Sequence, residues 1–337
     1  MHTKRDLLIL HWLQAVLSSD KFEINFLPGD ASFRRYARIR NNNKTFMLMD
    51  APPDKENCRT FVKIDEFFAE HNVRVPHIEA KDLEQGFLLL EDFGDVLLST
   101  LLDGPSVVTH YNQSLKQLHQ IQSINGEGVF PVYTHEKLIS EMNLLTDWLL
   151  PSLKIEPEPE EKAVIRHTFT ILANAALAQP QVIVHRDFHS RNLLITDGEQ
   201  EQGIIDFQDA VIGPDTYDLI SITRDAYIQR NRDLVNDWFT AFYDMLPSSA
   251  KESRDFKQFQ KDADFMAIQR HIKILGIFVR LFERDGKSNY LKDMPRVMWY
   301  LLEESEPYAE LQPFMQFIRA RVLPKFEAKF GLYKVVA

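Results

Sequence analysis

The chain has 337 residues, of which 45% are hydrophobic and 26% are charged. These proportions are those of an ordinary globular protein, and they exclude a fibrous, low-complexity or disordered chain. The formal net charge is −10, from 39 Lys and Arg against 49 Asp and Glu. Nucleic acid and anionic membranes are bound mainly through basic faces, so neither is an expected partner. A chain of this length usually builds more than one core, and we expect two lobes.

Cysteine usage and hydropathy limit the protein class further. Cys58 is the only cysteine in the sequence, so no intramolecular disulfide can form. The longest uninterrupted apolar runs, such as residues 87–90, are far shorter than the roughly 18 apolar residues of a membrane span. We therefore expect a cytoplasmic protein that does not cross a membrane.

The N-terminal segment allows two interpretations. Two basic residues precede an apolar stretch over 7–17, as they do in a signal peptide. Polar residues interrupt that stretch, however, and its leucines recur at helical spacing (Leu7, Leu10, Leu13 and Leu17). An amphipathic first helix is the preferred interpretation.

Residues 22–91 predict a small antiparallel sheet with one helix. Three strand-like runs, at 22–27, 33–40 and 45–50, are separated by turn residues and predict a meander. A helix follows over 57–69, where bulky apolar residues recur at helical spacing. A second β pair is expected from the runs at 77–80 and 86–91.

The remainder of the chain is expected to be mainly helical. Helices are predicted at 107–121, 135–149 and 159–178 and, in several pieces, from 217 to the C-terminus. One β island interrupts them, with short strands at 181–184, 192–196 and 203–205. The predicted fold class is α+β, with an antiparallel N-lobe over 1–92 and a larger helical C-lobe over 93–337.

The strongest chemical signal is the run from His185 to Asn192, which has the spacing H-x-D-x-x-x-x-N. Asp206 follows fourteen residues later, at the end of a predicted strand. A phosphoryl transferase must orient a hydroxyl nucleophile while a divalent metal bridges the phosphates. It needs one carboxylate for the hydroxyl and an amide oxygen with a second carboxylate for the metal. The alternative is that Asp187 and Asn192 merely cap turns.

The strings HRDFHSRN and IIDFQDAVIGPDTYDL resemble the catalytic loop and metal-binding segment of the aminoglycoside phosphotransferase and choline kinase family. The resemblance extends over roughly residues 22–300 and implies a two-lobed protein-kinase-like fold. GDASFRRYARI, MLMDAPP and GFLLLEDFGD resemble a bacterial subgroup that phosphorylates the anomeric hydroxyl of N-acetylmuramate or N-acetylglucosamine in cell-wall recycling. The implied cofactors are ATP and Mg²⁺, and the implied partner is a small sugar, with no obligate protein partner.

Carried onto this chain, the resemblance implies a role for each residue of the motif. Asp187 would be the catalytic base or the carboxylate that orients the acceptor hydroxyl, and Asn192 and Asp206 would bind Mg²⁺. Asp218 would fix the loop through its backbone, and His185 is expected to anchor the loop by hydrogen bonds. Residues 192–223 contain seven acids and no Lys or Arg, which favours a hard, oxygen-ligated cation.

The turn between the first two strands resembles the nucleotide loop of the family. It supplies the candidate phosphate ligands Ser32, Phe33, Arg34 and Arg35. Strand alternation places the two arginines on opposite faces. For adenine, the expected ligands are backbone groups of Leu90, Glu91 and Phe93, at the end of the fifth strand-like run.

The third strand departs from the usual kinase pattern. It has no lysine where kinases place the one that holds the α- and β-phosphates. An arginine of the second strand is a candidate substitute. Glu66, on the following helix, would face the missing lysine or else face solvent.

The acceptor is the least determined part of the site. Short polar side chains and an arginine would suit an N-acetyl sugar, and the candidates are His189, Gln208, Asp209 and Arg224. Two other functions stay open at this point. One is a small-molecule kinase for an aminoglycoside, choline or homoserine, and the other is a nucleotide-binding pseudokinase.

Overall fold

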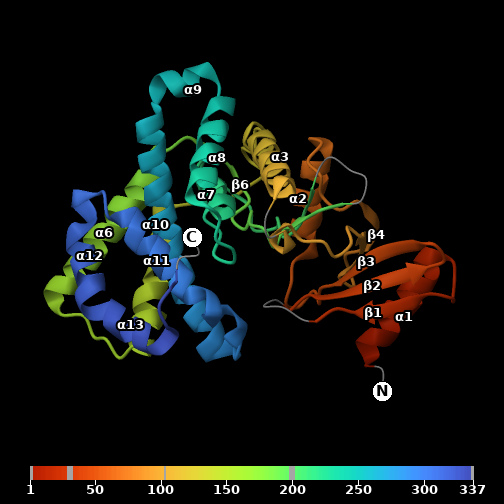
Figure 1. The fold of residues 1–337 in the computed structure, drawn as a ribbon. Coiled ribbons are helices and arrows are strands. Elements are labelled where there is room, and N and C mark those ends of the chain that lie inside the picture. The colour runs from red at the N-terminus through yellow and green to blue at the C-terminus, as the bar shows by residue number, and fades with distance from the viewer. Residues whose placement is uncertain (1–2, 29–32, 102–103, 197–201, 335–337) are drawn as a thin grey trace. The chain divides into compact units, whose positions relative to one another are not determined.

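The computed structural model describes residues 3–28, 33–101, 104–196 and 202–334, and Figure 1 shows its ribbon. The chain forms two compact units. The first consists of Met1–Leu98 with Asn192–Gln208, and the second of Ser99–Arg191 with Asp209–Ala337. Residues 192–208 thus belong to the N-terminal unit, whereas the predicted boundary between residues 92 and 93 assigns them to the C-lobe.

The first unit contains an antiparallel sheet with the strand order β1-β2-β3-β5-β4. Its strands are β1 (Glu23–Phe26), β2 (Arg35–Asn41), β3 (Lys44–Asp50), β4 (Ile78–Asp82) and β5 (Phe87–Glu91). The predicted meander and second β pair are confirmed. The pairing of β5 with β3 joins the two, so that the apolar run of β5 lies inside the sheet.

Helix α1 (Lys4–Leu17) begins with a capping box in which Thr3 and Asp6 exchange hydrogen bonds. It lies against the sheet (Figure 1), where Ile9 and Leu13 share a core with β2, β3 and β5. The helix is therefore confirmed. The buried face is not the expected leucine row, because Leu7 is 45% exposed and Ile9 is fully buried.

Helix α2 (Cys58–Glu70) follows β3 and buries Phe61 and Phe68. The ring of Phe207 packs against both, with centroid distances of 4.9 and 5.9 Å. Nearby, β7 (Leu193–Leu194) pairs with β8 (Gly203–Ile204). Gly203 lies so close to the Phe93 ring that a Cβ would meet it at 2.3 Å, so a larger residue would clash.

The second unit is mainly helical, as predicted. Its helices are α3 (Pro105–Gln122), α4 (His135–Leu144), α5 (Leu150–Ser152), α6 (Pro159–Ala178), α7 (Tyr217–Thr223), α8 (Arg232–Met245), α9 (Ser248–Ser253), α10 (Phe256–Asp285), α11 (Met294–Ser305), α12 (Gln312–Phe317) and α13 (Leu323–Phe330). Short 3₁₀ or π turns are η1 (Leu98–Thr100), η2 (Leu145–Leu149), η3 (Ser288–Asp293), η4 (Ala309–Leu311) and η5 (Ile318–Val322). The single helix expected over 135–149 is α4 continued by a π turn.

Helix α10 is the central element of the second unit and lies beside α11 in Figure 1. Asp255 caps its N-terminus and Gly286, in the left-handed region, ends it. At Gly276 the backbone of Leu144 lies 2.3 Å from where a Cβ would stand, so α10 and the α4 segment meet without a side chain between them. A two-stranded ladder pairs β6 (Gln181–Val184) with β9 (Val211–Pro214). In the part of the chain that the structure describes, no helix is long and apolar enough to span a membrane.

Candidate active site

The loop after β6 carries the predicted catalytic motif and is held at its start by Asp218. This buried carboxylate, in the first turn of α7, accepts the backbone N–H groups of His185 at 2.6 Å and Arg186 at 3.0 Å. Arg186 has a φ of +75°, a conformation that costs free energy for any residue but glycine. The two hydrogen bonds fix the chain through this turn, immediately before Asp187.

Asp187 is half-buried and keeps its negative charge. Burial alone would raise its pKa, but the positive charges of His189, Arg270 and Lys273 outweigh that effect and hold the pKa of Asp187 below its ordinary value. Its N–H donates to Nδ1 of His185 at 3.2 Å, and its carbonyl accepts from the N–H of His189 at 2.9 Å. An ionised carboxylate in a fixed loop can orient a hydroxyl and accept its proton.

Burial has the opposite effect on Asp218. It raises the pKa of this carboxyl to about 7, against the hydrogen bonds and the Arg270 charge that favour ionisation. Near neutral pH Asp218 is therefore partly protonated, whereas Asp187 is ionised.

A buried polar network holds Arg186 in the second unit. Its guanidinium donates to Glu141 of α4 at 2.6 Å, and its carbonyl accepts from Arg270 of α10 at 2.9 Å. Lys273 lies 3.1 Å from the same glutamate and donates to the Tyr217 hydroxyl at 3.0 Å. The sequence analysis missed this network because charged residues in long helices usually face water, and no local spacing distinguishes these from surface residues.

The end of the catalytic loop is fixed by Asp225, which the sequence analysis also missed. Its carboxylate accepts the N–H of Ser190 at 2.9 Å and the N–H of Tyr227 at 2.7 Å. The ring of Tyr227 meets the His189 ring edge-on at 5.1 Å. The candidate acceptor residue His189 thus has a defined position beside Asp187.

In the first unit, the structure brings the two predicted metal ligands together. Nδ2 of Asn192 lies 3.5 Å from Oδ2 of Asp206, and Gln208 donates to the other oxygen of that carboxylate at 2.8 Å. Asp206 is exposed and has a φ of +66°, while the next residue, Phe207, is anchored against α2. Among the described residues there is no cluster of three or more His, Cys, Asp or Glu that could hold a metal. An amide and one carboxylate still suit Mg²⁺, which typically takes its other ligands from water and substrate phosphates.

Arg34 and Arg35 lie in different surroundings within the first unit. Arg34 pairs with Glu56 at 3.1 Å and is close enough to Tyr36 and Asp206 to interact with their charges. Burial opposes its charge, but these neighbours raise the pKa of Arg34 above its ordinary value. The Arg35 guanidinium instead lies 2.6 Å from Asp50 and 3.2 Å from Asp6. Only Arg34 is therefore associated with the predicted metal ligand.

The other predicted nucleotide ligands differ in their exposure and in their hydrogen bonds. Phe33 is 62% exposed, and its N–H donates to Glu56 at 3.2 Å. Leu90 is buried in the sheet between its partners on β3 and β4. The N–H of Glu91 donates to the carbonyl of His77 and its carboxylate binds Arg74, so these groups are engaged within the fold. Ser32 lies outside the described residues.

Glu66 and Phe93, two further residues named in the sequence analysis, both contact side chains of the first unit. Glu66 faces solvent on α2, where it pairs with Lys81 of β4. Of the two interpretations given for Glu66, this is the solvent-facing one. The ring of Phe93 lies under the Arg74 guanidinium, 4.5 Å from its Cζ.

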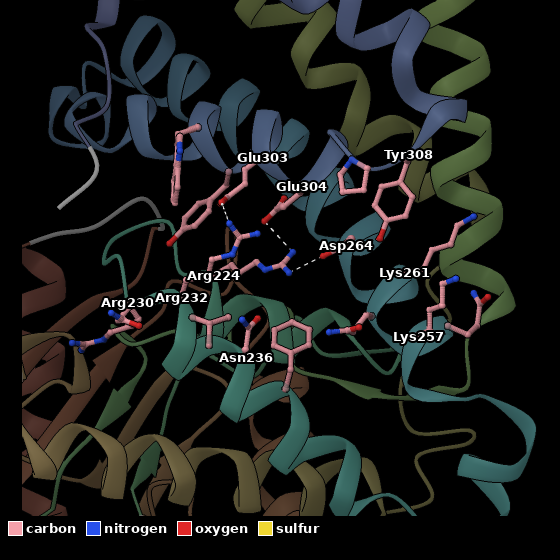
Figure 2. Close-up of a pocket in the computed structure, with 18 of the residues that line it drawn as sticks. Arg224, Arg230, Arg232, Asn236, Lys257, Lys261, Asp264, Glu303, Glu304 and Tyr308 are labelled. Carbon is pink, nitrogen blue, oxygen red and sulfur yellow. Dashed lines mark hydrogen bonds and ion pairs between the residues drawn. The ribbon is translucent and has the colours of Figure 1, made fainter. Parts of the chain in front are cut away.

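Arg224 lines a cavity of about 1020 Å³ in the second unit, shown in Figure 2. Its guanidinium pairs with Asp264 at 2.7 Å and Glu304 at 3.2 Å, as the dashed lines show. Two carboxylates therefore already balance its charge. Asp209 is exposed, and its carbonyl accepts from Arg186 at 3.4 Å.

Comparison with known proteins identifies the family. The model of the phosphotransferase enzyme family matches residues 23–252. The chain belongs to this family. The resemblance stated from the catalytic-loop motif is thereby confirmed, and so is the expectation of a phosphoryl-transferring enzyme.

Relatives cover most of the chain. It is 35% identical over 317 residues to an N-acetylmuramate/N-acetylglucosamine kinase of Neisseria meningitidis, an alignment that covers 92% of this chain and 94% of that one. It is 39% identical over 279 residues to a kinase of the same name from Pseudomonas aeruginosa, with 81% of each covered.

Solved structures confirm the predicted kinase-like fold. An ethanolamine kinase of Plasmodium vivax superimposes with a TM-score of 0.65 at 14% identity, and the alignment covers 91% of each chain. A choline kinase of Streptococcus pneumoniae gives a TM-score of 0.60 at 15% identity, covering 89% of this chain and 100% of that one. At these identities the likeness establishes the fold alone.

Proposed function

We propose that this protein transfers the γ-phosphoryl group of ATP to the anomeric hydroxyl of N-acetylmuramate or N-acetylglucosamine. The observation that carries the proposal is the clamped loop around Asp187, found in a chain whose relatives at 35% and 39% identity are kinases of these sugars. The product is the sugar 1-phosphate. We place the reaction in the cytoplasm, where ATP is available.

Asp187 is the proposed catalytic carboxylate. Its lowered pKa keeps it ionised at neutral pH, so it can accept a hydrogen bond from the sugar O1 hydroxyl and then its proton. As that proton leaves, O1 forms a bond to the γ-phosphorus and the bond from that phosphorus to the bridging oxygen breaks. ADP carries away the electron pair of the broken bond.

Asn192 and Asp206 are the proposed magnesium ligands. An amide oxygen and an exposed carboxylate are hard donors that leave positions for phosphate oxygens and water. When bound, Mg²⁺ neutralises the negative charge of the β- and γ-phosphates. The Gln208 amide, which donates to Asp206, would hold that carboxylate in place.

Arg34 is the proposed replacement for the lysine that β3 lacks. It is a cation next to the proposed magnesium ligand Asp206, and Glu56 fixes its orientation. Arg35 is not assigned to phosphate, because Asp50 and Asp6 already balance its charge. We assign adenine to the backbone of Phe93, since Leu90 is paired with strands on both sides, and we assign Ser32 and Phe33 to the phosphate turn.

For the acceptor, we propose His189, Asp209 and Gln208 as hydrogen-bonding partners. His189 lies in the same loop as Asp187 and is held by the Tyr227 ring. Arg224 is left out of the acceptor site, because Asp264 and Glu304 pair with its guanidinium.

The test is phosphate transfer from Mg-ATP to a panel of N-acetylmuramate, N-acetylglucosamine, glucose, kanamycin, choline and homoserine, with ³¹P NMR to locate the phosphate. An anomeric 1-phosphate on an N-acetyl sugar is the expected result. Transfer only to kanamycin, choline or homoserine would overturn the sugar assignment and keep the enzyme class. ATP binding without transfer to any acceptor would indicate a pseudokinase.

A further inference from the structure

Arg191 presents a cation at the end of the catalytic loop, four residues after Asp187. Its Cζ lies over the Tyr227 ring, 3.6 Å from the centroid, which is a close cation–π contact. The nearest carboxylate, Asp293, is 4.0 Å away, beyond hydrogen-bond distance. Within the described residues the guanidinium makes no hydrogen bond, and 37% of the side chain is exposed.

Two other arginines of the second unit, Arg186 and Arg224, differ in this respect. Arg186 donates to Glu141 at 2.6 Å, and Arg224 pairs with Asp264 at 2.7 Å. Their charges are therefore balanced by protein carboxylates. Arg191 combines an accessible, weakly paired guanidinium with a place in the catalytic loop.

Asp293 balances the Arg191 charge only in part. One of its oxygens accepts from Arg296 at 3.1 Å, and this stronger pair shares the single negative charge of the carboxylate. The other oxygen, which faces Arg191, is buried and has no hydrogen-bond partner among the described residues. The pairing of Arg191 with this carboxylate is therefore weak.

The position of Arg191 is fixed together with that of Asp187. Asp225 binds the backbone of both Ser190 and Tyr227, so the residue before Arg191 and the ring under it are held by one carboxylate. Four residues of extended chain span at most about 14 Å. Asp187 and Arg191 are therefore close enough for a sugar and an arginine side chain together to bridge them.

We infer that Arg191 binds the carboxylate of N-acetylmuramate and so favours this sugar over N-acetylglucosamine. The inference rests on the proposed function. The two sugars differ only by the lactyl ether on O3 of N-acetylmuramate, which ends in a carboxylate. A guanidinium over an aromatic ring can still present N–H groups to the two oxygens of a carboxylate. Stacking also orders the side chain before the sugar binds, which lowers the entropic cost of binding.

The experiment measures kcat/KM for both sugars with the full-length wild-type chain and with Arg191→Gln. Loss of a charge-assisted hydrogen-bonded pair predicts a fall of about 10-fold or more for N-acetylmuramate, mostly in KM. For N-acetylglucosamine we expect a change of less than about 2-fold, since no charged pair is lost. Arg191→Lys keeps the charge without the planar fork and should fall between the two. Arg232→Gln, which removes an exposed arginine of the same unit, is the matched control.

The methyl ester of N-acetylmuramate and the Arg191→Gln variant can be combined in a double-mutant cycle, in which one change is made in the substrate and the other in the enzyme. The wild-type enzyme should lose efficiency on the ester, and Arg191→Gln should treat ester and acid alike. Equal losses on both sugars, or a raised KM for ATP in the variant, would overturn the inference and leave the sugar kinase assignment standing. If the wild-type enzyme phosphorylates neither sugar, the proposed function and the inference fall together.

Discussion

Asp218→Asn tests how the catalytic loop is held. The carboxylate accepts two backbone N–H groups, whereas an amide has one acceptor oxygen and turns an NH₂ group toward the second N–H. One buried donor then lacks a partner, which costs about 1–3 kcal/mol of the free energy of unfolding. For a unit of this size the melting temperature should fall by roughly 2–12 °C. Asp187 follows directly, so a displacement on the order of 1 Å predicts a fall in kcat of about 10²-fold.

The pH dependence of the same variant gives an independent test. Burial raises the pKa of Asp218 to about 7 from an ordinary value of 3.8, so the folded chain binds a proton there more tightly than the unfolded chain. This contribution to stability is full below pH 3.8 and is lost as the pH rises toward 7. Asparagine has no such titration. The difference in free energy of unfolding between wild type and variant should therefore be larger at pH 5 than at pH 8.

Both parts can be measured by urea unfolding and steady-state kinetics. The matched control is Ser221→Ala, which removes a buried hydroxyl from the same helix that bonds only to the Tyr217 carbonyl. The control should keep kcat and lack the pH-dependent difference. A kcat for Asp218→Asn equal to that of the control, or a stability difference that grows with pH, would refute the reasoning.

Three further substitutions separate the parts of the proposed site. Asp187→Asn should lower kcat by at least about 10²-fold while isothermal titration shows ATP binding unchanged, because general-base catalysis typically contributes 10²–10⁴-fold; equal loss of ATP affinity would contradict its role. Asp206→Asn should raise the Mg²⁺ concentration needed for half-maximal activity, read from a magnesium titration, and an unchanged titration would exclude it as a ligand. Arg34→Gln should raise KM for ATP by about 10-fold, whereas Arg35→Gln should not; the reverse order would assign the phosphates to Arg35.

Local patterns predicted most of the elements. The helix predicted at 159–178 has the same bounds as α6, and its start follows from Pro159 and the acidic residues around it. The strands of the first unit follow from alternation and turn residues. β9 was not predicted, since its sequence Val-Ile-Gly-Pro carries two turn-forming residues and its partner β6 is 27 residues away at the nearest pair.

In the candidate site, too, residues that are close in sequence could be predicted, whereas residues brought in from distant helices could not. Asp187, Asn192 and Asp206 follow from spacing in one stretch of sequence. Glu141 and Lys273 act on that stretch from other helices, across 45 residues in the case of the Arg186–Glu141 bond. Their burial could not be inferred, because a charge in a helix is normally exposed and becomes buried only when its partner is brought to it by the fold.

These distant charges explain why the second unit holds ionised groups in its interior. Arg186 has a strained backbone, and three carboxylates from separate elements secure the loop around it: Asp218 of α7 at the backbone before Asp187, Glu141 of α4 at the Arg186 side chain, and Asp225 at Ser190. A buried ion pair adds little net stability compared with apolar packing, but removal of one partner leaves an unpaired buried charge at a high cost. Alternative loop conformations that break these pairs are therefore strongly disfavoured. The buried charges serve the position of Asp187, which phosphoryl transfer requires, more than the stability of the unit.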